Sequence, residues 1–175
     1  MSDIRDKEVL EWYEQFHESI FKYINMVIQD YQSAEDLRHE TFLKAYVNYE
    51  SFRGNSNPKT WLFSIAHNIT VDYIRKRRPL TILQDVLLFK KDLKPLPEEI
   101  VEIKENSQEL YNALAKLKGS YREVIILRKI KEFSIEETSI ILGWSESKVK
   151  STLFRAIQAL EKKLLKEGVL NEKIV

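Results

Sequence analysis

Residues 134–155 of this chain read SIEETSIILGWSESKVKSTLFR. The stretch holds two helix-start signals on either side of a single glycine. Ser134 and Glu137 have the spacing of a capping box, and Ser145 can cap a second helix. Gly143 permits the left-handed backbone conformation that ends a helix. This pattern predicts a helix-turn-helix, whose second helix enters the major groove of DNA, although an ordinary helical hairpin has the same spacing.

The second of these helices carries the residues best suited to duplex DNA. Lysine and arginine reach guanine acceptors, and serine can meet a base or a phosphate, so exposed positions of these types favour DNA contact. The candidates are Ser147, Lys148, Lys150, Ser151, Phe154 and Arg155. Three later lysines, Lys162, Lys163 and Lys166, lie too far along the helix to read bases and should meet phosphate or solvent. The faces that we expect to be buried are supplied by Ile140, Ile141, Val149 and Leu153.

The bulk composition is typical of a soluble globular protein. The chain has 175 residues, 43% hydrophobic and 31% charged, which suits one or two small domains. Only four Gly and four Pro are present, and the absence of cysteine excludes disulfides and thiolate metal sites. The N-terminus lacks the apolar run of a signal peptide, and no stretch approaches the roughly 18 apolar residues of a membrane span. We therefore expect a cytoplasmic protein.

Charge is distributed unevenly, although the formal net charge is only +1. Residues 75–78 read RKRR, and residues 148–167 hold six Lys or Arg against two acids. Acidic residues gather instead in residues 8–18, 35–40 and 98–109. Local basic patches on a near-neutral protein can bind phosphate while its acidic faces meet other partners.

The spacing of apolar residues predicts an all-α chain of two small helical domains joined by a linker. Helices are expected over residues 6–30, 33–49, 58–78, 108–119, 121–131, 134–143 and 145–168. Ser33, with Asp36 three residues later, is the expected cap of the second helix, and Pro79 is expected to stop the third. Residues 79–106 contain three prolines and a mixture of positive and negative charges, and they are interpreted as the linker. The second domain follows the linker and ends in the helix-turn-helix.

Three stretches, taken together, resemble the extracytoplasmic-function group of the sigma-70 family of bacterial sigma factors. The first is AEDLRHETFLKAY at residues 34–46. The second, within residues 52–76, contains FRG, KTWLFSIAHN and DYIRK, and the third, within residues 121–156, contains YREV, LG, VKS and RA. The resemblance implies a promoter-recognition subunit that docks on core RNA polymerase. Residues 1–78 would bind polymerase and recognise and melt the -10 element, and residues 107–175 would read the -35 element.

The first stretch forms a helix that is both acidic and apolar, which suits a protein partner because like charge repels phosphate. The resemblance implies that this helix grips the clamp helices of the largest polymerase subunit. The residues expected there are Glu35, Asp36, Leu37, Glu40 and Leu43. A solvated helix with ordinary core residues would show the same pattern. Phe42 and Tyr46 are expected to pack internally.

The second stretch mixes aromatic, amide and basic residues, the combination that single-stranded DNA requires. The resemblance implies that the loop over residues 53–58 captures a flipped base of the -10 element. The candidate contacts are Arg53, Asn55, Asn57, Lys59, Trp61, Asn68, Arg75, Lys76, Arg77 and Arg78. Trp61 could equally be core, whereas Leu62 and Ile65 favour the core and His67 could lie on the helix surface. The basic run could also complement the dipole at a helix end, though four charges exceed that need.

The chain departs from the family pattern at a few positions. Lys118 and Gly119 stand where the family usually has Leu-Pro, and Thr152 and Ile157 stand where it often has Arg. The recognition helix is therefore less basic than usual, and we expect weak DNA binding by the free chain, with most promoter affinity in the holoenzyme.

No catalytic, metal or cofactor site is expected. The histidines are His17, His39 and His67, and the pair Glu35 and His39 at helical spacing lacks a third metal ligand. Two other functions fit parts of the sequence: a stand-alone helix-turn-helix regulator, and a helical adaptor that does not bind DNA. The resemblance further implies an anti-sigma protein as a regulatory partner.

Overall fold

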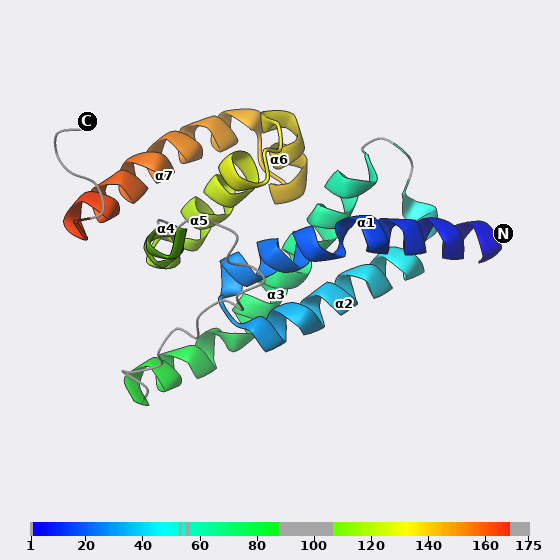
Figure 1. Cartoon of the computed structure of the whole chain (residues 1–175), viewed down its shortest axis with the longest axis horizontal. Coiled ribbons are helices and arrows are strands. Elements are labelled where there is room, and N and C mark those ends of the chain that lie inside the picture. The colour runs from blue at the N-terminus through cyan, green and yellow to red at the C-terminus, as the bar shows by residue number, and fades with distance from the viewer. Residues whose placement is uncertain (1, 53, 55–56, 88–106, 169–175) are drawn as a thin grey trace. The chain divides into compact units, whose positions relative to one another are not determined.

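The computed structural model describes residues 2–52, 54, 57–87 and 107–168, and within these ranges every regular element is helical (Figure 1). Contacts divide the chain into two units, residues 1–95 and 96–175. The first unit contains α1 (Ser2–Ile28), α2 (Tyr31–Val47), the short 3-10 helix η1 (Tyr49–Ser51) and α3 (Pro58–Leu87). The second contains α4 (Ser107–Ala115), α5 (Gly119–Ile125), the π-helix η3 (Ile126–Ile130), α6 (Ile135–Leu142) and α7 (Glu146–Lys166). The all-α, two-part architecture is as predicted.

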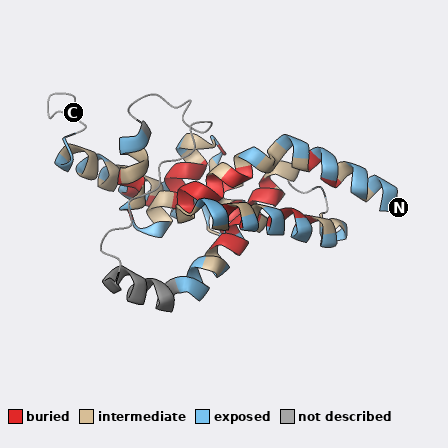
Figure 2. Cartoon of the chain, turned by 60° about the horizontal axis from the view of Figure 1, so that its bottom comes forward, coloured by how far each residue is buried: buried red, intermediate tan, exposed pale blue. Residues whose placement is uncertain are grey.

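The first unit is built by α1, α2 and α3, each of which packs against the other two. Buried residues concentrate in the second half of α1 and on the sides of α2 and α3 that face it (Figure 2). Its largest fully buried side chains are Ile20, Tyr23, Ile24, Leu62 and Phe63. Burying several such side chains stabilises the fold by roughly 1.5–3 kcal/mol each, so this core fixes the crossing of the helices.

The start of α2 differs from the prediction by three residues. The cap is Asp30, whose backbone is extended and whose carboxylate accepts the Ser33 backbone N–H at 3.3 Å and the Ser33 hydroxyl at 3.0 Å. The preceding residue, Gln29, has φ 55°, so the chain turns sharply after α1 and α2 begins at once. Both Asp and Ser are good caps, and the sequence alone did not distinguish them.

Pro79 does not stop α3, which continues to Leu87. Proline fixes φ at a helical value and forfeits one backbone hydrogen bond, so turns on either side can carry a helix past it. The prediction that the third helix ends at residue 78 is therefore wrong, because residues 79–87 are helical, whereas the bounds of the linker stay a prediction. The rest of the predicted linker, residues 88–106, lies outside the described residues.

The helix-turn-helix of the second unit has the caps that its sequence predicts. Ser134 and Glu137 form a complete capping box, Gly143 adopts φ 66° and ψ 33° at the end of α6, and the Ser145 hydroxyl accepts the Lys148 backbone N–H at 3.1 Å. Gly168, with φ 74°, follows the end of α7.

The buried faces of this unit agree with the prediction in part. Ile141 and Val149 are buried, whereas Ile140 is 46% exposed and was wrongly assigned to the core. Helix α6 has only eight residues, and its inward positions are taken by Thr138, Ile141 and Leu142. A helix of two turns offers one narrow inner face, which leaves Ile140 outside it.

The helix expected over residues 121–131 is interrupted by the π-helix. The Lys131 backbone N–H donates to the Ile126 carbonyl at 2.8 Å, five residues back, and the Arg128 guanidinium donates to the Phe133 carbonyl. The wider turn inserts an extra residue that apolar periodicity does not signal.

Replacing Gly119 and Gly143 by alanine should change the free energy of unfolding in opposite directions. Gly143 has a positive φ that an L-residue adopts at a cost, so Gly143→Ala should lower the free energy of unfolding by about 1–2 kcal/mol. Gly119 is the first residue of α5, without a positive φ and with open space at Cβ, so Gly119→Ala should raise it by about 0.4–1 kcal/mol. Urea unfolding of the two variants tests this, and changes of the same sign would contradict it.

Candidate functional site

The exposed stripe of α7 brings together most of the residues predicted to contact duplex DNA. Ser147, Lys150, Ser151, Phe154 and Arg155 line one shallow hollow at spacings of three and four residues. Phe154 is 65% exposed and lies among these polar and basic side chains. Lys148 adjoins the stripe and is also exposed.

The inner side of α7 explains one departure from the family pattern. Thr152 is only 5% exposed and faces the core with Val149 and Ala156. The position therefore belongs to the packing of α7, and its lack of a charge does not weaken the exposed stripe.

A cavity of about 240 Å³ lies where α2, η1 and α3 meet. Trp61 and Asn68, both predicted DNA contacts, help to line it. The other lining residues are Lys44, Asn48, Ser51, Ile65 and Ile69. An aromatic face, amide groups and an ammonium group around one cavity are suited to an unstacked base.

The loop between α2 and α3 is described only in part. Arg53 and Asn55 lie outside the described residues. The Asn57 carboxamide oxygen accepts the Thr60 backbone N–H at 2.8 Å, so Asn57 caps α3 and has a structural task besides any contact with DNA. Lys59 is partly exposed in the first turn of α3.

Four aromatic rings support the loop and the cavity. Trp12 of α1 stacks on Tyr49 at 5.9 Å between ring centroids and meets Phe52 edge-on at 5.4 Å and Trp61 edge-on at 5.9 Å. The Tyr49 hydroxyl donates to the Glu8 carboxylate at 2.7 Å, and this bond raises the pKa of Tyr49. Trp61 is therefore a packing residue that also lines the cavity, and its contact with DNA stays a prediction.

The basic run lies within α3 and not at its end. Arg75, Lys76 and Arg77 are exposed, and the side chain of Arg78 lies outside the described residues. Since α3 continues for further turns to Leu87, compensation of a C-terminal dipole does not explain the run.

Arg77 also has a partner within the protein. Its guanidinium donates to Asp30 at 3.4 Å and to the Tyr73 hydroxyl at 2.5 Å, and that hydroxyl donates to Ser33 at 2.8 Å. Burial would raise the pKa of Asp30, but the hydrogen bonds from Ser33 and the positive charge of Arg77 outweigh it and lower that pKa. The network ties α3 to the start of α2, so any DNA phosphate would compete with Asp30 for Arg77.

His67 is not a surface residue. It is 9% exposed, and its Nδ1 atom lies 3.4 Å from the hydroxyl of the fully buried Tyr23. The interpretation of His67 as a surface histidine is therefore wrong. Leu62 is core, as predicted, and Ile65 is partly exposed at the cavity.

The predicted polymerase-binding residues divide into exposed and buried ones. Glu35, Asp36 and Glu40 retain exposed area, with Glu35 3.7 Å from Arg38 and Glu40 3.7 Å from Lys44, and Leu43 is 66% exposed. Leu37 is 6% exposed and packs in the core, so it does not belong to the outer face.

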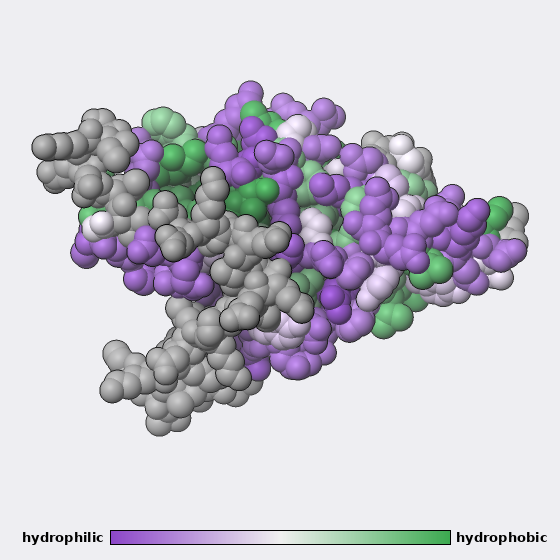
Figure 3. All heavy atoms as spheres, in the orientation of Figure 1, coloured by the Kyte–Doolittle hydropathy of each residue, from purple (hydrophilic) through white to green (hydrophobic). Residues whose placement is uncertain are grey.

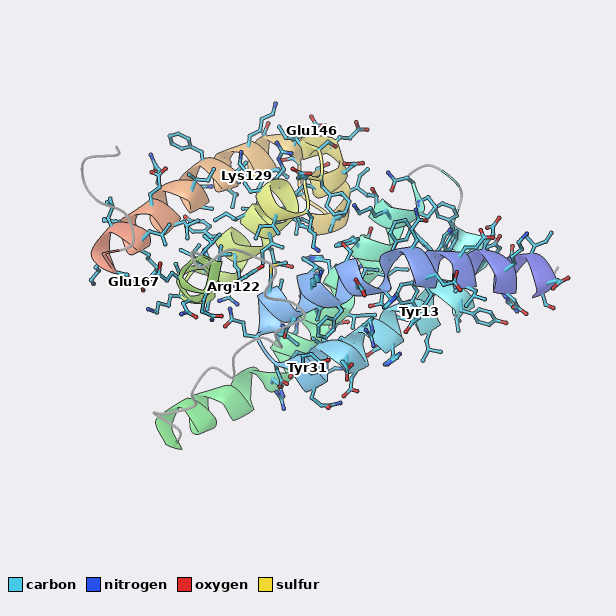
Figure 4. All side chains as sticks on the ribbon, viewed as in Figure 1. Tyr13, Tyr31, Arg122, Lys129, Glu146 and Glu167 are labelled. Carbon is cyan, nitrogen blue, oxygen red and sulfur yellow. The ribbon has the colours of Figure 1, made fainter. Side chains whose placement is uncertain are left out.

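An apolar groove between α1 and α2 lies beside these acidic residues. It is lined by Asp6, Val9, Leu10, Tyr13, His39, Phe42, Leu43 and Tyr46. Tyr13 lies between the two helices (Figure 4), and hydrophobic atoms surface beside α1 and α2 among mostly hydrophilic neighbours (Figure 3). Sequence reasoning missed Leu10, which is 58% exposed; the signal was an apolar residue outside the buried stripe of α1.

Phe42 is buried, as expected. Tyr46 is partly exposed and forms hydrogen bonds to Arg5 and Asp6, which join α2 to α1.

Arg122 holds the second unit together. Its guanidinium donates to the carbonyls of Leu114 at 2.9 Å, Ala115 at 2.5 Å and Leu117 at 3.1 Å, and it lies beside the end of α4 (Figure 4). Burial lowers the pKa of Arg122, an effect that the nearby Glu123 partly offsets. The guanidinium thus donates hydrogen bonds to carbonyl groups at the end of α4 that lack an N–H partner within the helix.

Two other kinds of site are absent from the part of the chain that the structure describes. No group of three or more His, Cys, Asp or Glu side chains there could hold a metal ion. None of the helices in the same residues is long and apolar enough to span a membrane.

Two family models match this chain. Sigma-70 region 2 matches residues 12–79, and sigma-70 region 4 matches residues 107–160. The chain belongs to the sigma-70 family. The ECF RNA polymerase sigma factor SigX of Bacillus subtilis is 36% identical over 171 residues, covering 93% of this chain and 87% of SigX. SigM of the same organism is 37% identical over 165 residues, covering 93% of this chain and 98% of SigM.

Solved structures agree with this assignment. The sigma factor RpoE from Bartonella quintana, solved with the anti-sigma factor NepR, has a TM-score of 0.76 and 28% identity over 90% of this chain and 97% of RpoE. CnrH has a TM-score of 0.67 at 19% identity, over 91% of this chain and 88% of CnrH, and so shares the fold. This sigma factor of the extracytoplasmic-function group binds core RNA polymerase and directs promoter-specific initiation. Sigma factors are initiation factors, and the interpretation as a stand-alone regulator is not favoured.

Proposed function

We propose that the two units divide the work of promoter recognition. Residues 1–78 bind core polymerase and hold the melted -10 element, residues 107–175 read the duplex -35 element, and residues 79–106 link the two. The observation that carries the proposal is the exposed stripe of α7, where four polar or basic side chains and an unburied phenyl ring share one face.

Polymerase binds at the groove between α1 and α2. Leu10 and Leu43 provide exposed apolar area at the groove, and Asp36 and Glu40 provide negative charge beside it. An apolar centre with a charged rim is the usual anatomy of a protein interface. The negative rim also disfavours DNA on this face, because phosphate is repelled.

The cavity beside the loop receives an unpaired base of the -10 element. Trp61 offers a ring face and Asn68 an amide, and the basic run from Arg75 follows the strand backbone. Stacking contributes about 1–3 kcal/mol per base, which offsets the few kcal/mol needed to extract a base from the duplex. The aromatic support from Trp12 keeps this cavity open before DNA arrives.

The stripe of α7 enters the major groove of the -35 element. Lys150 and Arg155 lie on the same face as Ser147 and Ser151 and extend from a helix whose start is fixed by the Ser145 cap. Residues near the beginning of a recognition helix reach base edges, which makes this part of α7 the base-reading part.

This sigma factor works in the cytoplasm beside polymerase and carries no catalytic activity or cofactor of its own. We further propose that an anti-sigma protein regulates it. The support is that RpoE, 28% identical to this chain, was solved with the anti-sigma factor NepR. Such a protein would compete for the faces that bind polymerase or DNA.

Run-off transcription with purified core polymerase tests the role of α7. We expect the double variant Lys150→Ala, Arg155→Ala to lower promoter-directed transcript by roughly 30-fold or more, because each of two base contacts is worth about 1–3 kcal/mol. The variant should still bind core polymerase in a pull-down, since those side chains are not on the groove.

The matched control is Lys162→Ala, Lys163→Ala, which removes the same charge from the same helix beyond the stripe. This control should lower transcription only slightly. Equal losses from both double variants would mean that α7 acts through charge alone, and loss of polymerase binding in the first would mean that the stripe has another partner.

A further inference from the structure

Lys148 occupies an unusual position for a lysine. Its backbone N–H donates to the capping Ser145 hydroxyl, so it stands in the first turn of α7, whose start is marked by Glu146 in Figure 4. The first turn of a helix carries positive partial charge, which disfavours a cation. A long, exposed lysine side chain at that position would ordinarily turn outward and sample many rotamers.

The ring of Trp144 holds this lysine. The Lys148 ammonium lies 4.4 Å from the centroid of the Trp144 ring, within the range of a cation–π contact. Tryptophan is the aromatic side chain that attracts a cation most strongly, so the ring compensates for the unfavourable helix end.

The backbone beneath the ring is fixed on both sides. The Trp144 backbone N–H donates to the Ser139 carbonyl at 3.0 Å, which ties it to α6, and Gly143 before it is held in the left-handed conformation. Ser145 after it caps α7. The backbone that carries the ring is therefore held in place within the turn, and the ring itself is partly exposed.

Lys148 adjoins the proposed base-reading stripe in the first turn of α7. Its carbonyl accepts the Ser151 hydroxyl at 3.3 Å, and the Ser151 carbonyl accepts Arg155 Nε at 3.3 Å, so the three residues follow one line along α7. An ammonium group at the first position of this line is placed to reach DNA together with Ser151 and Arg155.

We propose that Trp144 is a positioning residue for -35 recognition, which holds the Lys148 ammonium against its ring so that the lysine meets DNA with little loss of rotamer freedom. This inference rests on the proposed DNA-reading role of α7. Trp144 then contributes to promoter affinity through Lys148 and not through a contact of its own.

A double-mutant cycle on the holoenzyme tests the proposal. Affinity for promoter DNA is measured for the wild type, Trp144→Leu, Lys148→Met and the double variant. Trp144→Leu should weaken binding roughly 2- to 5-fold when Lys148 is present, the range of an exposed cation–π contact, and should have no effect in the Lys148→Met background. Trp144→Phe, which keeps a weaker aromatic face, should fall between the wild type and Trp144→Leu.

The outcomes separate this inference from the role of α7. If Trp144→Leu weakens binding equally with and without Lys148, the ring acts by packing and the inference is overturned. If Lys148→Met has no effect while the Lys150 and Arg155 variant loses transcription, α7 reads DNA but Lys148 does not, and the inference also fails. If neither variant of α7 affects the promoter, the proposed function itself fails. Should Trp144→Leu not fold, Trp144→Phe in the two Lys148 backgrounds gives the same comparison.

Discussion

Replacing Leu43 by lysine is expected to weaken the binding of this sigma factor to core polymerase by about 30-fold or more. Leu43 is 66% exposed at the groove between α1 and α2, so nothing in the fold depends on covering it. The substitution removes apolar area from the centre of the proposed interface and places an ammonium group there, which must be desolvated on docking. A titration with labelled core polymerase measures the change.

Ile4→Lys is the matched control for this prediction. Ile4 is 61% exposed on α1 but does not line the groove, so the same change of size and charge should alter polymerase affinity little. Leu10→Lys, on the opposite wall from Leu43, should behave like Leu43→Lys. If Leu43→Lys and Ile4→Lys weaken binding alike, the groove is not the docking site and general charge explains the loss.

Replacing Arg122 by methionine should lower the free energy of unfolding of the second unit by about 3–5 kcal/mol. The guanidinium serves the carbonyls of Leu114, Ala115 and Leu117 at once, and methionine leaves all of them without this donor in a partly buried site. Arg122→Lys keeps the charge but lacks the planar fork of donors, and it should recover only part of the loss.

Hydrogen exchange of the full chain, followed by mass spectrometry on peptides from residues 107–168, measures this effect where it acts. Peptides from α4 and α5 should exchange faster in Arg122→Met, whereas those from the first unit should not change. Lys129→Met, at an exposed basic position of the adjoining π-helix, is the control and should leave exchange nearly unaltered. Unchanged protection in Arg122→Met would show that α4 is held by apolar packing alone.

Helix caps and turns that depend only on neighbouring residues were predictable from the sequence. The capping box at Ser134, the left-handed Gly143 and the cap at Ser145 each depend on a few adjacent atoms, and all three stand as predicted. The exposed stripe of α7 follows from the same signals, because once the start of a helix is fixed its faces are fixed too.

Features that depend on tertiary context were not predictable in the same way. Asp30 and Ser33 compete for one cap, and the sharp turn at Gln29 decides between them. Proline at residue 79 weakens a helix locally without ending it. The burial of Leu37 and His67 depends on how α1 and α3 cross α2, which periodicity within a single helix does not reveal.

The apolar groove between α1 and α2 was also not predictable from the sequence. Leu10 is an apolar residue in a helix that has many, and only its exposure distinguishes it from its neighbours. The aromatic cluster is also invisible to local patterns, because Trp12 and Trp61 are far apart in the sequence and meet at 5.9 Å.

That cluster has a consequence for how such a protein diverges. Trp12 belongs to the helix that bears the proposed polymerase groove, yet its ring also packs against Trp61, which lines the proposed base-binding cavity. A substitution on α1 selected for a better fit to polymerase can therefore alter which start sites are opened, without touching any residue that meets DNA. The proposed roles of the groove and the cavity thus predict that adaptation to polymerase and promoter preference change together through the Trp12 indole.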